Sequence, residues 1–441
     1  MENKLIRWVL SSIEKNSNKT FIVNKNIEYL YSKFFYDARK VYRYLKVGRV
    51  LLKPTDKYFY AVTYIAGLLK HSMLFLSNKD SHVYDEYKFD QIIDDEFVQN
   101  ILDKDEEPIS IEEIDLSIDE NEPLMVVLSS GTSLKPKPIV LSYKAVRTNI
   151  ESGFKLFHVD PNWTFVSLLP LDHAFGITSD FLDLLLSGVR VVYTYSLMEY
   201  FMFLRKYSPD MISIPITILK TLKDMMVEQG KAVLGNNIKQ ILVGGSKCYK
   251  EIVNFFKEYN ITVCTSYGLT ECAPCVSICS PEHFMLDSDG MVFDCHHIRF
   301  SEENEIIVSG DSIMLNYLDE YDKGHIVSEV HTKDVGYIKD GFLFVTGRLD
   351  NLIIMDNGFK IQPETFEKEL LSNYPYVKDC VVYYYNHQLY LDAIMDEKHK
   401  KELRTALNSL DIEINVVNEI KKNALGKTSR IYYKNGKKEE N

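Results

Sequence analysis

A loop rich in glycine, hydroxyl groups and lysine follows directly after a short apolar run. The run spans residues 124–128, and the loop extends from Ser129 to Lys137. Glycine lets backbone N–H groups approach a polyphosphate, hydroxyl groups add short donors, and lysine supplies positive charge. The Gly-x-x-x-x-Gly-Lys spacing of a Walker loop is absent here, and Gly426-Lys427-Thr428 lacks its first glycine because position 421 is lysine. The sequence therefore predicts another kind of phosphate-binding loop at the end of a strand.

Several other segments alternate between apolar runs and helical patterns. The apolar runs are residues 165–170, 189–193 and 238–243, and the last of them ends at Gly244-Gly245. In the segment 246–259 the apolar residues Ile252, Phe255 and Phe256 recur at helical spacing. This rhythm predicts an α/β fold, in which ligands bind at the carboxyl ends of the strands.

Composition limits the class of protein. A chain of 441 residues is too long for one core of ordinary size, so two or more domains are expected. With 46% hydrophobic and 26% charged residues it is predicted to be globular. The longest apolar stretch, residues 58–69, is shorter than the roughly 20 residues that a membrane span needs, and the N-terminus does not resemble a signal peptide. A cytoplasmic protein without a membrane span is expected.

The net charge of -12 is concentrated in one segment. Residues 85–122 contain sixteen acidic side chains and two lysines. Nucleic acid is not expected as a partner, because phosphate backbones require a basic face. A solvated surface segment is the favoured interpretation of the acidic stretch, and a docking surface is the alternative.

The seven cysteines do not predict a disulfide framework in a chain of this length. Cys272, Cys275 and Cys279, with Cys264 before them and His283 after them, allow a metal site as one interpretation. No second pair has finger-like spacing, so packing as small apolar residues is favoured.

Three more motifs follow the loop in a fixed order. They are residues 267–271 (Tyr-Gly-Leu-Thr-Glu), Asp334 with residues 347–350 (Gly-Arg-Leu-Asp), and Gly426-Lys427. Each alone is weak evidence, and for the pentapeptide by itself an ordinary turn after a strand is the alternative interpretation. Their order and spacing resemble the adenylate-forming superfamily of acyl-CoA synthetases, acyl-carrier-protein synthetases and adenylation domains, over nearly the whole chain.

The resemblance implies a division into two domains. A large N-terminal domain of layered β-sheets and helices would span residues 1–347, and a small mobile α+β domain would span residues 351–441. Residues 348–350 would form the hinge between them. In the small domain the sequence predicts a helix at 363–372 and a strand at 379–385. Compared with many relatives, the region before Ser129 is short.

The resemblance also implies a nucleotide site. Tyr267 would offer a face to adenine, Asp334 would hold the ribose hydroxyls, and Arg348 would add donors in a fixed fork. Magnesium would be bound by Glu271 and Thr132. The full set of implied ATP- and AMP-binding residues is Ser129, Ser130, Gly131, Thr132, Ser133, Lys137, Gly244, Gly245, Ser246, Ser266, Tyr267, Gly268, Asp334 and Arg348.

The implied reaction has two halves, with Lys427, Thr270, Glu271 and His173 as the catalytic residues. A carboxylate first attacks the α-phosphate of ATP, which gives an acyl-adenylate and pyrophosphate, and Lys427 bridges the carboxylate and the phosphate. Rotation at Asp350 then withdraws Lys427 and brings the loop at Gly358 to the adenylate for attack by a thiol. Positioning and charge neutralisation would supply most of the catalysis.

The phosphate loop departs from the family pattern at three positions. Family members usually have glycine where this chain has Leu134 and Pro138, and threonine where it has Ser133. Serine keeps the hydroxyl, whereas leucine loses freedom at positive φ and proline removes a donor. Either the loop is stiffer than usual or phosphate binding is impaired. A catalytically weak adenylate-binding or scaffold protein is therefore kept as a rival from another class.

Residues 169–176 bear on the acid. Amino-acid-activating relatives typically carry an aspartate beside a phenylalanine in this region, whereas this chain has His173, Ala174 and Phe175. An apolar or aromatic acid without an α-amino group is therefore expected. Two interpretations of His173 stay open, a gate for the carboxylate and a packed loop histidine.

The acceptor is expected to be a phosphopantetheine thiol. Residues 271–277 and 173–176 look especially like fatty-acid ligases that load acyl carrier protein, which is the first prediction, and an acyl- or aryl-CoA ligase is the alternative. Basic residues near the end could meet an acidic carrier protein, although solvated surface charge is favoured for most of them. These are Lys421, Lys422, Lys427, Arg430, Lys434, Lys437 and Lys438.

Overall fold

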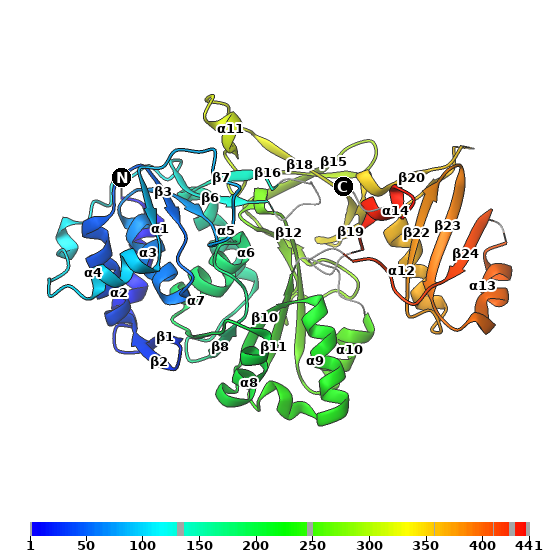
Figure 1. Ribbon diagram of the computed structural model, residues 1–441, viewed down its shortest axis with the longest axis horizontal. Coiled ribbons are helices and arrows are strands. Elements are labelled where there is room, and N and C mark those ends of the chain that lie inside the picture. The colour runs from blue at the N-terminus through cyan, green and yellow to red at the C-terminus, as the bar shows by residue number, and fades with distance from the viewer. Residues whose placement is uncertain are drawn as a thin grey trace. The chain divides into compact units, whose positions relative to one another are not determined.

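Two compact units make up the protein, as the contacts of a computed structural model show. The first unit consists of Met1–Ile298 and Val308–Val330, and the second of Arg299–Ile307 and His331–Asn441. The chain passes between the units within β15 (His296–Phe300), β16 (Glu305–Gly310) and β18 (Glu329–Lys339). The structure describes residues 2–129, 136–244, 250–356, 358–408, 410–422 and 428–437. Each unit is described below by itself (Figure 1).

The larger sheet of the first unit has a parallel centre. The order within this unit is β14-β13-β12-β11-β10-β8-β9-β1-β2. The six central strands from β12 to β1 run parallel, whereas β2, β13 and β14 are antiparallel to their neighbours. Their carboxyl ends therefore meet at one edge. The strands are β1 (Thr20–Asn24), β2 (Ile27–Leu30), β8 (Thr164–Ser167), β9 (Arg190–Tyr193), β10 (Met211–Pro215), β11 (Gln240–Gly244), β12 (Thr262–Gly268), β13 (Cys275–Ile278) and β14 (Met291–Val292).

A second sheet of the first unit carries the predicted phosphate loop. Its order is β17-β7-β6-β4-β3-β5, with β3 to β6 parallel and β7 and β17 antiparallel to their neighbours. The strands are β3 (Arg49–Leu52), β4 (Met73–Leu76), β5 (Gln91–Ile93), β6 (Pro123–Leu128), β7 (Pro138–Ser142) and β17 (Asn316–Tyr317). The predicted loop connects β6 to β7, so its two ends belong to adjacent antiparallel strands.

Several helices of the first unit begin where a polar side chain accepts hydrogen bonds from N–H groups that have no partner within the helix. Asp56 accepts from Tyr58 N–H and Phe59 N–H, and Ser142 accepts from Ala145 N–H. The α-helices are α1 (Lys4–Lys15), α2 (Tyr31–Tyr44), α3 (Lys57–Leu69), α4 (Asp95–Leu102), α5 (Tyr143–Leu156), α6 (Ala174–Ile177), α7 (Asp183–Ser187), α8 (Leu197–Tyr207), α9 (Ile216–Gln229), α10 (Lys250–Glu258) and α11 (Leu318–Tyr321). Shorter turns are η1 (Ile111–Glu113), η2 (Thr178–Leu182), η3 (Lys231–Leu234) and η4 (Thr270–Cys272).

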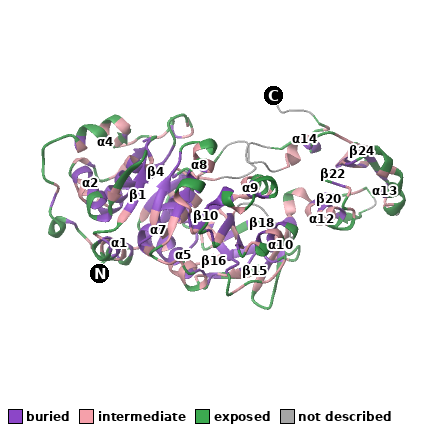
Figure 2. Ribbon diagram, turned by 90° about the horizontal axis from the view of Figure 1, so that it is seen from below, coloured by how far each residue is buried: buried purple, intermediate pink, exposed green. Residues whose placement is uncertain are grey.

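The apolar faces of these helices cover the parallel strands. Figure 1 shows α9 and α10 beside β10, β11 and β12, and the contacts agree. Ile252 and Phe256 of α10 are buried in this core, and Phe255 packs against it, which confirms the predicted apolar face. Figure 2 shows the strands of the first unit as mostly buried, whereas α4 combines exposed, intermediate and buried residues. Burial of the sheet on both faces explains why its strands are continuous apolar runs.

The second unit has its own small core. β18 pairs antiparallel with β19 (Phe342–Arg348), and β20 (Ile353–Ile354) pairs with β21 (Lys360–Ile361). A three-stranded sheet has the order β22-β23-β24. Its strands are β22 (Asp379–Tyr385), β23 (Gln388–Ile394) and β24 (Ile412–Val416). The helices are α12 (Pro363–Asn373), α13 (Lys400–Ala406) and α14 (Arg430–Lys434), with turns η5 (Leu349–Asn351) and η6 (Glu397–His399).

The predicted α/β architecture is confirmed, with small shifts of element ends. The strand expected at 379–385 is β22, and the helix expected at 363–372 is α12. The run 165–170 is a strand only to Ser167, because Pro170 and the turn after it lead into α6. The second unit also contains residues 331–347, since β18 pairs with β19 and Thr365 donates to Thr346 O. The hinge at residues 348–350 stays a prediction.

The acidic segment 85–122 is part of the folded first unit. It contains β5, α4 and η1, and basic side chains of α2 donate to its backbone. Arg39 donates to Ile109 O (2.7 Å), and Lys40 donates to Lys104 O (2.6 Å). Among the helices in the described part of the chain, none has the length and apolar character needed to cross a membrane.

Candidate functional site

The two ends of the predicted phosphate loop are tied to each other. Ser129 N–H donates to Lys137 O (2.9 Å), and Lys137 N–H donates to Ser129 Oγ (2.9 Å). Pro138, one of the departures from the family's loop pattern, is the first residue of β7 and lies opposite Leu128 of β6. The first position of a strand is one where proline is tolerated. The backbone N–H group that proline lacks is therefore missing at the base of the loop, where the chain enters β7.

A tyrosine connects this loop to the motif at 267–271. Tyr317 O–H donates to Glu271 Oε1 (3.0 Å), and the ring of Tyr317 faces Lys137, whose Nζ lies 5.0 Å from the ring centroid. Burial raises the pKa of Tyr317 well above its ordinary value, and the charge of Glu271 adds to that shift, so the phenol remains a donor. The structure thus brings Lys137 and Glu271 to one place. Sequence reasoning did not find Tyr317.

The 267–271 motif lies at the carboxyl end of β12. Ser266, Tyr267 and Gly268 are the last residues of the strand, and Thr270 and Glu271 begin η4. A side chain at Gly268 would place its Cβ 2.0 Å from Pro274 O, so glycine is required there. Thr270 is buried, and Met314 N–H donates to Glu271 O (2.8 Å). The backbone around the carboxylate is therefore held in place.

The segment predicted to bind the acid lies beside β11 and β12. A Cβ at Gly244 would lie 2.9 Å from two ring carbons of Phe175 and 3.4 Å from Ser266 Oγ. Gly244, Phe175 and Ser266 are therefore in close contact at the carboxyl ends of these strands. His173 precedes α6, its carbonyl oxygen accepts from Ile177 N–H, and its side chain is exposed.

Two other predicted residues pair within the second unit. Asp334 on β18 lies opposite Arg348 on β19, and Arg348 Nη1 is 3.3 Å from Asp334 Oδ1. Asp334 is buried, whereas Asp350 is half exposed and lies 3.5 Å from Lys333 Nζ. Gly358 is exposed, with a φ of +79° that favours glycine. The guanidinium in this pair keeps the carboxylate of Asp334 at a fixed place on the strand.

Several predicted site residues lie outside the described part of the chain, and their predicted roles stay predictions. They are Ser130, Gly131, Thr132, Ser133, Gly245, Ser246 and Lys427, together with Leu134 of the phosphate loop.

The predicted cysteines are packed in the first unit. Cys264, Cys272 and Cys279 are buried, and burial raises the pKa of the Cys275 thiol above its ordinary range. In the segments that the structure describes, no three His, Cys, Asp or Glu side chains are grouped so that they could hold a metal ion.

Three of the basic residues in the described part of the chain's end form ion pairs within the second unit. Arg430 Nη2 lies 2.6 Å from Glu367 Oε2, Lys422 lies 2.7 Å from Asp379, and Lys437 lies 2.8 Å from Asp392. Lys434 Nζ donates to the backbone oxygen of Asp350. The ion pairs neutralise three of the positive charges that a carrier protein could have met.

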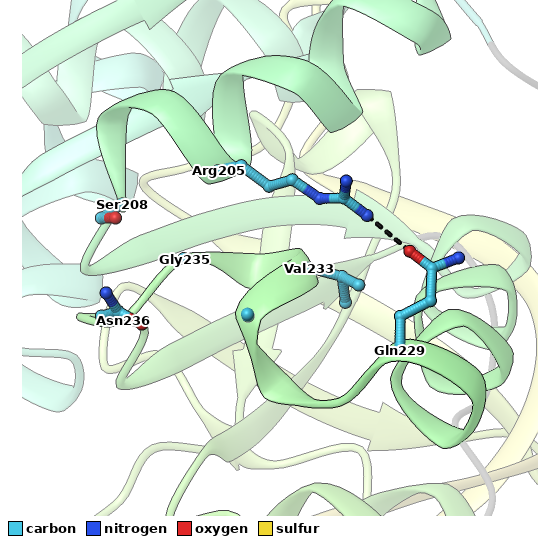
Figure 3. Close-up of a pocket in the computed structure, with 7 residues that line it drawn as sticks. Arg205, Ser208, Gln229, Val233, Gly235 and Asn236 are labelled. Atoms are coloured by element: carbon cyan, nitrogen blue, oxygen red, sulfur yellow. Dashed lines mark hydrogen bonds between the residues drawn. The ribbon is translucent and has the colours of Figure 1, made fainter.

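One surface pocket contains none of the predicted residues. Figure 3 shows it between α8 and η3, with a volume of about 430 Å³. Arg205 donates across it to Gln229 Oε1 (2.6 Å). Ser208 and Asn236 line it and precede β10 and β11, so it lies near the amino ends of these strands. Ligands of parallel sheets bind at the opposite ends, so the pocket is not assigned to the site.

Buried ionisable groups lie directly after the acid segment. Asp180 accepts from Ser167 Oγ–H (2.7 Å), and Lys57 Nζ donates to Leu169 O (2.9 Å). Asp180 Oδ1 and Asp183 Oδ1 are buried and have no hydrogen-bond partner among the described residues. Burial raises the pKa of Asp183 from 3.8 to about 8, and the charge of Asp180 adds to that shift. Burial also raises the pKa of Asp180 and lowers that of Lys57.

The stability of the protein should therefore depend on Asp183. Between the ordinary pKa of 3.8 and the raised value of about 8, the folded chain holds a proton that the unfolded chain has released. The free energy of unfolding should thus fall as pH rises through this range. The asparagine in Asp183→Asn cannot ionise. Between about pH 5 and about pH 8 the variant should therefore lose less free energy of unfolding than the wild type, by at least about 1.4 kcal/mol, the equivalent of one pKa unit. Urea unfolding at about pH 5 and about pH 8 measures the difference.

Asp224→Asn, which changes an exposed carboxylate on α9, is the matched control. It should keep the pH dependence of the wild type. Equal losses of stability in the wild type and Asp183→Asn between the two pH values would show that Asp183 is already ionised in the folded protein.

Comparison with known proteins places these observations in a family. The model of the AMP-binding enzyme family matches residues 63–318. A 2-succinylbenzoate–CoA ligase of Bacillus cytotoxicus is 27% identical over an alignment of 282 residues, and the match covers 57% of this chain and 55% of the relative. One from Bacillus mycoides is 26% identical, over 59% of this chain and 57% of the relative. The chain thus spans about half the length of the curated relatives it matches.

Solved structures share the fold. The o-succinylbenzoate-CoA synthetase MenE of Bacillus subtilis, in complex with its acyl-adenylate intermediate, has a TM-score of 0.78 at 19% identity and covers 98% of both chains. ATP-bound MatB of Rhodopseudomonas palustris has a TM-score of 0.84 at 14% identity, covering 99% of this chain and 100% of its own. The resemblance to adenylate-forming enzymes is confirmed. Because the family match spans more than half of the 441 residues and includes Lys137, Glu271 and Tyr317, the chain belongs to the family of AMP-binding enzymes.

Proposed function

We propose that this protein is an ATP-dependent ligase that joins a carboxylic acid to the thiol of coenzyme A through an acyl-adenylate. One observation carries the proposal. The loop residue Lys137 and the carboxylate of Glu271 lie on either side of Tyr317 in the first unit. A cation for phosphate oxygens and a carboxylate for a metal ion are the two charges that bound Mg-ATP requires.

The residues of the first unit divide the work of adenylation. Lys137 attracts phosphate oxygens, and the hydroxyl of Thr270 donates to the α-phosphate. At the end of β12, Tyr267 offers its ring to adenine and Ser266 contacts the nucleotide beside it. Phe175, beside Gly244, offers an apolar face to the acid. Lys427 is proposed to bridge the acid and the α-phosphate, as the family resemblance implies. Positioning of this kind accounts for large rate effects without covalent chemistry by the protein.

Glu271 fits magnesium, because a carboxylate beside phosphate oxygens is a preferred ligand for that ion. Thr132 is proposed as a second contact. Magnesium, when bound, withdraws charge from the phosphate oxygens. MenE of Bacillus subtilis has also been solved in complex with ATP and magnesium ion, at 19% identity to this chain.

Residues of the second unit are proposed to bind the ribose and to mediate the change from adenylation to thioester formation. Asp334 accepts from the ribose hydroxyls, and Arg348, which already pairs with it, adds donors to ribose or phosphate. Asp350 is the proposed hinge residue, and Gly358 belongs to the loop proposed to border the path of the thiol. The exposure of both residues is compatible with these roles.

Coenzyme A is proposed as the acceptor in place of acyl carrier protein, the first sequence prediction. The curated relatives quoted above are CoA ligases. Three of the basic residues that could have met a carrier protein, Lys422, Arg430 and Lys437, instead form ion pairs within the second unit. The proposed acid is aromatic, with 2-succinylbenzoate as the first candidate because the curated relatives are named for it.

Acid-dependent ATP–pyrophosphate exchange, followed by thioester analysis, tests this function. The purified full chain is given Mg-ATP and 2-succinylbenzoate, benzoate, a fatty acid or phenylalanine in turn. The acid that supports exchange is then offered with coenzyme A or with holo acyl carrier protein. We expect exchange with an aromatic acid and a thioester with coenzyme A alone.

Each other outcome removes a specific part of the proposal. A thioester only with the carrier protein would restore the first prediction, and exchange only with fatty acids would contradict the aromatic acid. Binding of ATP without exchange for any acid would support the rival, an adenylate-binding protein with an impaired loop. Leu134→Gly should then increase exchange, because it restores the freedom that the family pattern has at that position.

A further inference from the structure

We propose that Tyr317 is a positioning residue that holds Glu271 and Lys137 in place for magnesium and the phosphates of ATP. The inference rests on the proposed function and extends it. Nothing in the sequence pattern pointed to this tyrosine, which lies 46 residues after Glu271.

A hydrogen bond from Tyr317 holds the carboxylate of Glu271. Tyr317 O–H donates to Glu271 Oε1 at 3.0 Å, and it is the side-chain bond that fixes the carboxylate in the described structure. A carboxylate has two oxygens, so this bond leaves Oε2 for a cation. An acceptor that already has one fixed donor loses less conformational entropy when it takes up a metal ion.

The ring of Tyr317 contacts the lysine. Lys137 Nζ lies 5.0 Å from the centroid of the Tyr317 ring, within the range of a cation–π interaction. The ammonium group is attracted to the ring face, and the hydroxyl at the ring edge is directed at Glu271. One side chain thus keeps a cation and an anion near each other without a direct ion pair between them. A direct pair would have neutralised the charges that Mg-ATP is proposed to meet.

The tyrosine itself is held rigidly. Tyr317 belongs to β17, which pairs with β7, and it lies opposite Ile139, two residues after Lys137. Asn316 Oδ1 accepts from Tyr317 N–H (2.8 Å), and Asn316 Nδ2 donates to His325 O (3.1 Å). The position of the ring is therefore set by the sheet that also carries the loop.

The experiment compares variants that remove the hydroxyl or the whole ring. Tyr317→Phe keeps the ring beside Lys137 and removes only the bond to Glu271, whereas Tyr317→Leu removes both contacts. Tyr321→Phe is the matched control, since Tyr321 on the adjacent α11 packs in an apolar cluster with Leu318. Two readouts are used, ATP–pyrophosphate exchange as a function of Mg²⁺, and calorimetric binding of ATP with and without Mg²⁺.

A hydrogen bond to a charged group is stronger than one between neutral groups, so Tyr317→Phe should weaken Mg-dependent ATP binding about tenfold or more. The Mg²⁺ concentration for half-maximal exchange should rise, whereas ATP binding without Mg²⁺ and the unfolding midpoint should change little. Tyr317→Leu should also weaken binding without Mg²⁺, because Lys137 loses its contact. In a Glu271→Gln background, Tyr317→Phe should weaken Mg-dependent ATP binding less than it does in the wild type. The two effects are not additive when one residue acts through the other.

A purely structural tyrosine would behave differently. Tyr317→Phe would then lower stability while leaving the Mg²⁺ dependence at the wild-type value, and its effect would add in full to that of Glu271→Gln. Either result would overturn the inference. If the wild type shows no exchange with any acid, the proposed function fails, and the binding measurements with and without Mg²⁺ still decide the role of Tyr317.

Discussion

Lys427→Ala is expected to lower acid-dependent ATP–pyrophosphate exchange by about 10²–10³-fold, the loss seen when one preorganised donor to a developing charge is removed. The ammonium group is proposed to bridge the acid and the α-phosphate during adenylation only. When the acyl-adenylate is supplied directly, the variant should form the CoA thioester at a rate within about tenfold of the wild type. The two half-reactions are measured separately, by isotope exchange and by single-turnover thioester formation.

Lys398→Ala changes an exposed lysine of the same unit and is the control for loss of one positive charge. It should leave both half-reactions unchanged. If Lys427→Ala slowed the thioester step as much as adenylation, the lysine would have to remain at the site in both steps. The proposed withdrawal by rotation at Asp350 would then be wrong.

Glu271→Gln should be the second most damaging change, with exchange reduced about 10²-fold or more. The amide keeps the size of the side chain but lacks the charge that binds magnesium. It can still accept a hydrogen bond from Tyr317 O–H through its carbonyl oxygen. The loss should therefore come from the metal and not from the local fold. Titration of exchange with Mg²⁺ should show a higher concentration for half-maximal rate.

Glu282→Gln, at an exposed carboxylate of the first unit, is the matched control for Glu271→Gln. Its Mg²⁺ dependence should equal that of the wild type. A Glu271→Gln protein with lowered rate and an unchanged Mg²⁺ requirement would contradict the assignment of this carboxylate to the metal. The metal ligands would then have to be sought among other residues of the site.

The fold class and the family could be predicted from the sequence because both depend on patterns of neighbouring residues. Apolar runs, turns and the fixed order of the motifs were sufficient to recognise strands such as β22 and helices such as α12. Pro138 was harder to interpret. Its lost donor was expected either to stiffen the loop or to impair phosphate binding, and both alternatives stay predictions. The residue is the first of β7, and a single sequence does not show where a loop returns to a strand.

Tyr317 could not be predicted for a related reason. Its contact with Glu271 depends on the pairing of β17 with β7, and neither strand pairing nor register is visible in the residues around position 317. The buried Asp180 and Asp183 did give a signal. Two aspartates within the apolar segment that follows His173 are unusual, and such groups mark burial with a raised pKa. A search for charged residues inside apolar runs would have found them.

The two hydrogen bonds between Ser129 and Lys137 connect the ends of the predicted phosphate loop to each other. Both ends are anchored to neighbouring strands, so the distance between them is fixed whatever residues lie between. The residues between these two ends can therefore be replaced together, while β6 and β7 keep their pairing. A graft that replaces only residues 130–136 with a glycine-rich segment of equal length would retain the same point of departure and return. This chain thus offers a scaffold on which phosphate loops of different composition can be compared at one fixed attachment.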